Sequence, residues 1–235
     1  MIQSLTKDIK KLLIEFGADI VGIGKIDEVE AKTRKDMPYG ICIAVAIPKE
    51  VVNDLRVAPS MNYFDTYHLI NDKLDKLSTL GAEFLKSQGF KAYPQTNASV
   101  NEYATEYSTQ LPHKTVATRC GIGWIGKCAL LITDEYGSAV RITSILTNAP
   151  LEAGTPNNES KCGNCMLCTN ACPAQAVKGI NWNINLSREE FFDPIKCKRK
   201  AREISNERLD KEITLCGKCI NVCPYTQAYL KRTKI

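Results

Sequence analysis

The stretch CGNCMLCTNACP, residues 162–173, decides how this chain is organised, and a second stretch, CGKCINVCP at residues 216–224, repeats its pattern without the opening cysteine. The spacing C-x2-C-x2-C-x3-C-P places three thiolates on one [4Fe–4S] cluster and sends the fourth to a second cluster. The terminal proline has no N–H and a fixed φ, so it turns the chain where it leaves a cluster. These stretches predict a region that binds two clusters.

The second stretch needs one more ligand, and Cys197 is the free cysteine between the two stretches. In the bacterial ferredoxin pattern the last cysteine of each run ligates the other cluster. We therefore predict a crossed arrangement. The first ligand set is Cys162, Cys165, Cys168 and Cys223, and the second ligand set is Cys197, Cys216, Cys219 and Cys172.

A zinc ribbon and a disulfide framework are the alternatives. Tetrahedral zinc takes four ligands, usually as two separated pairs, and gains nothing from a four-cysteine run with a terminal proline. The N-terminal residues MIQSLTKDIKKLL have no apolar signal core, so we expect a cytoplasmic protein in a reducing compartment, where disulfides are rare. The cluster interpretation is therefore favoured over both.

Length and charge set broad limits. The 235 residues leave room for one sizeable domain and a small one. No apolar run approaches the roughly 18 residues that span a membrane, so no membrane association is expected. The formal charge of +5 counts cysteines as neutral. Because each four-thiolate cluster is anionic, net charge alone does not indicate a nucleic-acid partner.

The remaining chain alternates helical and strand patterns. Periodic apolar residues predict helices over residues 5–16 and 63–88, the second with Leu69 among its inner residues. Apolar runs with β-branched residues predict strands at residues 18–24, 39–48 and 139–146, and we expect a further strand at residues 91–95. Residues 96–112 are polar, so we expect a surface loop or the wall of a site. Residues 148–160 have the composition of a linker and mark a domain boundary.

A second motif, GIGWIGK at residues 121–127, puts three glycines around Trp124. Glycine allows backbone to press close to a flat ligand, although a glycine-rich turn with a core tryptophan has the same pattern. Cys120 and Cys128 flank the motif, and buried structural thiols are the favoured interpretation of both and of Cys42. The basic run at residues 196–202 could bind RNA phosphates or an acidic electron donor, but the favoured interpretation is that it offsets the negative charge of the clusters.

The order of these motifs resembles that of epoxyqueuosine reductases, corrinoid-dependent iron–sulfur enzymes of tRNA modification that are related to reductive dehalogenases. The resemblance rests on GIGWIGK, on Leu130-Leu-Ile, on Glu135-Tyr-Gly137 and on the cysteine layout. It extends upstream to FGADIVGIG at residues 16–24 and to the pair Tyr67-His68. It implies an α+β protein: a nitroreductase-like α/β domain that binds cobalamin, residues 1–152, and a ferredoxin-like domain with two [4Fe–4S] clusters, residues 153–235.

The resemblance also assigns residues to the corrinoid. The cofactor contacts that it implies are His68, Arg119, Gly121, Gly123, Trp124, Gly126 and Lys127. The catalytic aspartate of epoxyqueuosine reductases falls at or near Tyr107, and no aspartate lies between Asp75 and Asp134. Reductive dehalogenases use a tyrosine as proton donor, so Tyr107 is the catalytic candidate, with Tyr103 as the alternative if the register shifts. The other interpretation, favoured by the polar sequence around it, is an exposed tyrosine in a surface loop.

These features predict an oxidoreductase that passes electrons from two clusters to a corrinoid, which reduces a bound small molecule or modified nucleoside. The expected electron donor is a low-potential protein of the ferredoxin or flavodoxin type. Epoxyqueuosine reductases continue into a helical-repeat domain that helps to grip tRNA, whereas this sequence stops shortly after Tyr229, which leaves tRNA as a weaker expectation. The alternative is a two-cluster electron carrier, or an activator that reduces a partner corrinoid and has no substrate of its own.

Overall fold

The structure is a computed structural model that describes residues 2–102 and 109–232. The chain divides into two compact units, and each unit draws on several separate stretches of sequence. The first unit takes residues 1–45, 70–123 and 141–157, and the second takes residues 46–69, 124–140 and 158–235. The division into functional domains between residues 152 and 153 stays a prediction.

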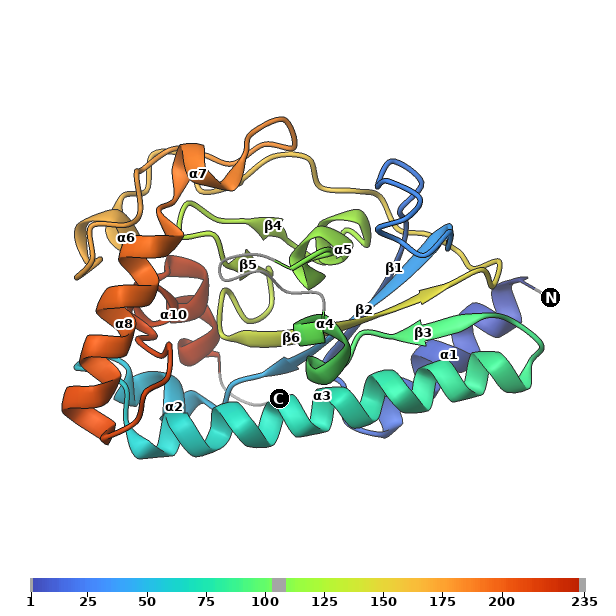
Figure 1. Ribbon diagram of the computed structural model, residues 1–235, viewed down its shortest axis with the longest axis horizontal. Coiled ribbons are helices and arrows are strands. Elements are labelled where there is room, and N and C mark those ends of the chain that lie inside the picture. Colours follow the sequence, from blue (N-terminus) through green and yellow to red (C-terminus); the bar gives the residue numbers. More distant parts are fainter. Residues whose placement is uncertain (1, 103–108, 233–235) are drawn as a thin grey trace. The chain divides into compact units, whose positions relative to one another are not determined.

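A four-stranded sheet organises the first unit, in the order β1-β2-β6-β3 (Figure 1). Its strands are β1 (Ile20–Lys25), β2 (Tyr39–Ala46), β3 (Ala92–Pro94) and β6 (Val140–Thr147). β1 is antiparallel to β2, and β3 is antiparallel to β6. β2 is buried along nearly its whole length, as its continuous apolar run predicted. The four predicted strands are confirmed.

Helices α1 (Ile2–Glu15), α4 (Asn97–Glu102), α5 (His113–Arg119) and residues 70–87 of α3 (Met61–Ser87) complete the first unit. The two helices predicted from periodicity, α1 and α3, are confirmed. Leu69 is an exception, because its side chain is 71% exposed and the next residue, Ile70, takes the inner position. One residue turns a helix by about 100°, so the two side chains face different directions.

Part of the polar segment at residues 96–112 is helical, so the predicted surface loop is wrong there, whereas the alternative, the wall of a site, stays a prediction. Polar side chains hold the start of α4: the Ser99 backbone N–H donates to the Thr96 hydroxyl, and the Asn97 backbone N–H donates to the Asp75 carboxylate over 2.9 Å. Such side-chain acceptors satisfy N–H groups that a helix start leaves unpaired. A low apolar content therefore did not exclude a short, capped helix.

The second unit combines a short hairpin, β4 (Trp124–Ile125) with β5 (Leu131–Ile132), and a series of helices. These helices are α2 (Lys49–Asp54), α6 (Leu167–Asn170), α7 (Arg188–Phe191), α8 (Pro194–Leu209), α9 (Lys218–Val222) and α10 (Pro224–Lys231). Trp182 and Phe191, from the segment between the two cysteine stretches, are buried together with Ile125, and Phe192 packs against them. No helix within the described ranges is both long and apolar enough to cross a membrane.

Candidate iron–sulfur site

All four cysteines of the first ligand set line one pocket in the second unit, here called the cysteine pocket. Its volume is about 410 Å³, including space that is open to solvent. Cys162, Cys165 and Cys168 come from one short stretch, whereas Cys223 comes from the other. The fold therefore brings together the thiols that the crossed ligand pattern requires on one cluster.

Local backbone geometry places these thiols. The Cys165 backbone N–H donates to the Cys162 carbonyl over 3.1 Å, which closes a turn before α6 carries Cys168. Cys223 lies between α9 and α10, and Pro224 is the first residue of α10. Proline is accepted there because the first helical N–H has no partner within the helix. This confirms that the chain turns at the proline that follows Cys223.

Trp124 packs against two of the cysteines that line the cysteine pocket. Its side chain is fully buried against Ile132, Cys223 and Cys162, and its ring centroid lies 4.9 Å from that of Tyr225. Among the described residues the indole Nε1 has no hydrogen-bond partner, although a buried N–H group normally has one. An orphaned donor packed against ligand thiols suits a site for an anionic cluster, whose sulfurs accept hydrogen bonds.

Cys128 also lines the cysteine pocket, which the sequence did not predict. Its thiol is buried and hydrogen-bonded to the thiols of Cys168 and Cys219. The contact with Cys168 lowers the pKa of Cys128, but Cys219 and burial together raise that pKa well above its ordinary value. Its position directly after the GIGWIGK motif was the only sequence signal for such a role.

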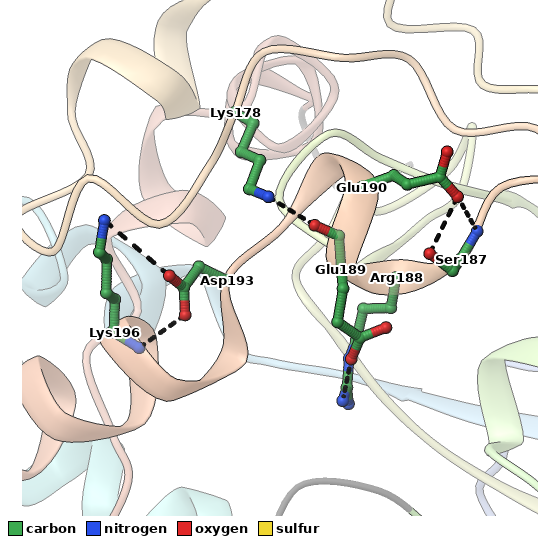
Figure 2. Close-up of polar contacts among 7 residues, drawn as sticks. All are labelled: Lys178, Ser187, Arg188, Glu189, Glu190, Asp193 and Lys196. Atoms are coloured by element: carbon green, nitrogen blue, oxygen red, sulfur yellow. Dashed lines mark hydrogen bonds and ion pairs between the residues drawn. The ribbon is translucent and has the colours of Figure 1, made fainter.

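In the second ligand set, Cys172 and Cys197 are linked through hydrogen bonds around the start of α8. The Ala176 backbone N–H donates to Cys172 Sγ over 3.3 Å, and the Asp193 N–H donates to the Ala176 carbonyl over 2.8 Å. The Asp193 carboxylate then caps α8 by accepting from the Lys196 backbone N–H over 2.9 Å (Figure 2). Cys197 follows in the first turn of α8.

Cys216 joins these two thiols. Burial, followed by the negative charges of Cys172 and Cys216, raises the pKa of Cys197 to about 11. Ser205, buried on α8, donates to the carbonyl of Leu215 over 2.7 Å and so fixes the residue before Cys216. The fourth member of the set, Cys219, lines the cysteine pocket. Among the described residues, no three or more His, Cys, Asp or Glu side chains form a group that could hold a single metal ion.

The residues around α8 also show how the basic run is used. Figure 2 shows the ion pair of Lys196 with Asp193, next to the Ser187–Glu190 capping box that starts α7. Further along α8, Arg199 and Lys200 pair with Glu203. Carboxylates of the same region therefore offset part of the positive charge that the sequence shows at residues 196–202.

The predicted corrinoid contacts of the first unit have protein partners. Arg119 is buried, and its guanidinium pairs with the Glu28 carboxylate and donates to the Asn157 carbonyl over 2.7 Å. The Gly123 carbonyl accepts from the Asn157 side-chain amide over 2.9 Å. Gly121 has a φ of +72°, and a Cβ there would overlap the backbone oxygen of Thr155. These glycines allow close packing of backbone on backbone.

The other predicted contacts are distributed differently. Lys127 is buried, and a Cβ on Gly126 would overlap the Ile132 side chain. His68 is exposed on α3, with its ring 4.6 Å from that of Phe64. The role of these residues toward a corrinoid stays a prediction. Tyr107 and Tyr103 lie outside the described residues.

His113 makes a polar contact within the first unit, where its Nδ1 lies 2.9 Å from the Ser144 hydroxyl. Burial, with a smaller contribution from Arg141, lowers the pKa of His113 to about 4. The imidazole is therefore neutral at pH 7.

Comparison with known proteins supports the cluster interpretation. Residues 161–226 match the family described as "4Fe-4S double cluster binding domain". The chain is 34% identical over 172 residues to an epoxyqueuosine reductase of Listeria monocytogenes, an alignment that covers 70% of this chain and 40% of that protein. It is 28% identical over 195 residues to the enzyme of Atelocyanobacterium thalassa, which covers 76% and 61%. The chain thus spans about half the length of these relatives.

Solved structures share the fold. The catabolic reductive dehalogenase NpRdhA in complex with 3-bromo-4-hydroxybenzoic acid has a TM-score of 0.74 and 16% identity, over 96% of this chain and 32% of that one. An epoxyqueuosine reductase with a modified tRNA stem loop has a TM-score of 0.62 and 20% identity, over 96% and 66%. A reductive dehalogenase studied for B12-dependent dehalogenation has a TM-score of 0.73 and 17% identity, over 95% and 32%. The predicted resemblance to both groups is confirmed.

Proposed function

We propose that this chain, similar in sequence to epoxyqueuosine reductases and in fold to reductive dehalogenases, is an iron–sulfur oxidoreductase. The observation that carries the proposal is the cysteine pocket, in which Cys223 joins Cys162, Cys165 and Cys168. This pocket lies within the segment that matches the double-cluster family. Two [4Fe–4S] clusters, one on each ligand set, would supply one-electron transfer at low potential.

The chain's own residues bind and shield these clusters. Cysteine thiolates ligate the iron, and Trp124 with Ile132 forms an apolar wall against Cys223. Exclusion of water strengthens every electrostatic interaction within the site. On the second ligand set, the Ala176 backbone N–H donates to Cys172 Sγ and holds that ligand in place. When bound by the two ligand sets, the clusters would supply one-electron transfer without a proton, and the expected donor is a low-potential protein of the ferredoxin or flavodoxin type.

The acceptor after the clusters in this proposal is a corrinoid, bound by a nitroreductase-like domain at residues 1–152 that is followed in the sequence by a ferredoxin-like domain at residues 153–235. Support comes from the shared fold with a reductive dehalogenase described as B12-dependent. A corrinoid supplies a strongly reducing cobalt when it is bound. Arg119, Trp124 and Lys127 are buried and contact protein, so no step is assigned to them on a corrinoid.

The substrate class that fits is a modified nucleoside with a reducible group, because the relatives are epoxyqueuosine reductases. Removal of an epoxide oxygen as water leaves an alkene and consumes two electrons and two protons. Each turnover would therefore need two successive one-electron deliveries. Tyr107 is the proposed proton donor, since an ordinary phenol with a pKa near 10 holds its proton at pH 7.

A two-cluster electron carrier that acts on a partner corrinoid protein is the second candidate. It is favoured by the absence of any aspartate between Asp75 and Asp134 and by the protein contacts of the buried Arg119 and Lys127. Such a carrier would be reduced and would donate electrons, but it would bind no cobalamin of its own.

One experiment separates the two candidates. The chain is reconstituted anaerobically and assayed for iron and sulfide, and we expect about eight of each per chain. Cobalamin is then titrated into the loaded protein while visible absorbance and the Co(II) EPR signal are recorded. Binding, followed by turnover of epoxyqueuosine-containing tRNA, supports the reductase. Full clusters without cobalamin binding support the carrier, and a chain that assembles no clusters contradicts both.

A further inference from the structure

Lys127 is a buried lysine beside the cysteine pocket. Its exposed fraction is only 3%, and it lies in the short connection between β4 and β5. This connection is a tight turn, because the Ala129 backbone N–H donates to the Gly126 carbonyl over 2.8 Å and the Gly126 N–H donates to the Leu130 carbonyl over 2.9 Å. The turn holds the backbone at Lys127 in place, and the side chain lines the pocket.

The ammonium group has no carboxylate partner among the described residues. The contact that the structure records for Lys127 Nζ is the Met166 thioether sulfur at 3.7 Å. A thioether is neutral and a weak acceptor. Removing an ammonium from water is unfavourable unless an anion or good acceptors replace the water. The burial of this lysine therefore calls for an anionic occupant of the space that it faces.

The other polar side chains that line the pocket are the thiols of the first ligand set, the thiols of Cys128 and Cys219, and the neutral phenol of Tyr225. A [4Fe–4S] cluster on four thiolates is an anion with sulfurs that accept hydrogen bonds, and its potential depends on nearby charge and hydrogen bonds. We propose that Lys127 is the counter-charge of the cluster in the cysteine pocket and raises its reduction potential. This inference rests on the proposed function, because it requires that cluster.

The physical reason is electrostatic. Reduction adds one electron to the cluster and no proton, so it adds one negative charge inside the pocket. A buried cation is poorly screened, and it stabilises the more negative, reduced state more than the oxidised state. Loss of this charge should therefore lower the reduction potential of the cluster of the first ligand set.

The test is a potentiometric titration of the reconstituted chain, monitored by EPR, for wild type and Lys127 variants. With Lys127→Met, which removes the charge from a chain of similar length, we expect the reduced-to-oxidised ratio of one cluster to fall about tenfold at a fixed potential. This is a shift of about 59 mV to more negative values for a one-electron couple. The other cluster should change less than threefold. Lys127→Arg keeps the charge and should stay within threefold of wild type.

Lys161 provides the matched control. Like Lys127, it is a lysine of the second unit. Its Nζ lies 4.9 Å from the centroid of the Trp124 ring, but its side chain is 51% exposed. Solvent screens its charge, so Lys161→Met should shift neither cluster by more than about twofold. Unchanged potentials in Lys127→Met, or an equal shift in Lys127→Arg, would overturn the inference.

Iron content keeps the two proposals apart. If the wild type assembles fewer than about eight irons, the proposed function fails. If the wild type contains about eight irons and its cluster potentials equal those of Lys127→Met, only this inference fails. Should Lys127→Met lose its cluster, Lys127→Gln serves as the second neutral variant. If the cluster of Lys127→Gln has the same reduction potential as in the wild type, the inference is contradicted. If its reduced-to-oxidised ratio at a fixed potential falls at least threefold, the inference is supported.

Discussion

Gly137 shows how strictly one residue is constrained beside the cluster ligands. It has a φ of +58°, and a Cβ there would overlap the backbone nitrogen of Thr226, close behind Cys223 and Pro224. Thr226 is fully buried, and its hydroxyl accepts from the Ser138 backbone N–H over 3.0 Å. The turn at Glu135-Tyr-Gly137 thus packs directly against the first residues of α10.

We predict that Gly137→Ala lowers the free energy of unfolding by about 2–5 kcal/mol. Left-handed backbone costs a non-glycine residue about 1–2 kcal/mol, and overpacking costs about 1–3 kcal/mol more. Urea unfolding measures the loss, and iron analysis should show weaker cluster retention. Gly89→Ala is the control, because Gly89 has a φ of +85° but open space around it. Equal losses in both variants would contradict the packing argument.

The ligand assignment is tested at Cys197 and Cys128. Cys197 lies near Cys172 and Cys216, whereas Cys128 is a buried thiol in the cysteine pocket that belongs to neither ligand set. We expect Cys197→Ala to retain about half of the iron, because one of the two clusters loses a ligand. Cys128→Ala should retain all of it. If iron is lost in Cys128→Ala and kept in Cys197→Ala, the second ligand set is wrong.

At the scale of elements, helix α8 carries Cys197 and is tied to two other members of the second ligand set. Its N-cap Asp193 leads back to Ala176 and Cys172, its first turn holds Cys197, and Ser205 ties it to the residue before Cys216. The helix thus connects three ligands that are far apart in the sequence. Helices α6, α9 and α10 play the same part for the first ligand set, since they carry or flank Cys168 and Cys223.

Ser205→Ala should destabilise this arrangement by about 1–3 kcal/mol, because it leaves the buried Leu215 carbonyl without its hydrogen-bond donor. Iron should also leave the second cluster faster, which the decay of its visible absorbance under a chelator measures. Asn206→Ala is the matched control on the exposed side of α8, with an expected change within about 0.5 kcal/mol. Iron loss at the same rate in both variants would exclude a role for Ser205 in holding Cys216.

At the scale of the whole molecule, cluster binding changes the net charge. The sequence has a formal charge of +5 with neutral cysteines and an isoelectric point of about 8.6. Each four-thiolate cluster brings about two negative charges, so two clusters lower the formal charge to about +1. We expect anaerobic isoelectric focusing to place the loaded chain well below the unloaded chain. An unchanged isoelectric point in a chain with about eight irons would contradict this charge accounting.

The sequence alone predicted the cluster chemistry, the strands and the long helices. Ligand spacing is a local property of a few neighbouring residues, and apolar periodicity reflects which face of an element is buried. Both can be read without knowing what lies opposite. Two details of the prediction were wrong. Leu69 is exposed because its neighbour Ile70 takes the buried position, and α4 forms within the predicted loop because polar side chains cap this short helix.

Only the tertiary structure decided which residues meet. Nothing in the sequence distinguishes Lys127 and Cys128 from other residues beside a glycine-rich motif. The tertiary structure shows that the connection between β4 and β5 places both of them in the cysteine pocket. The sequence suggested Arg119 as a contact of the cofactor. In the structure its guanidinium pairs instead with the Glu28 carboxylate, which lies 91 residues earlier in the chain. The cost of burying a charge depends on the groups that surround it, and those surroundings come from distant parts of the chain.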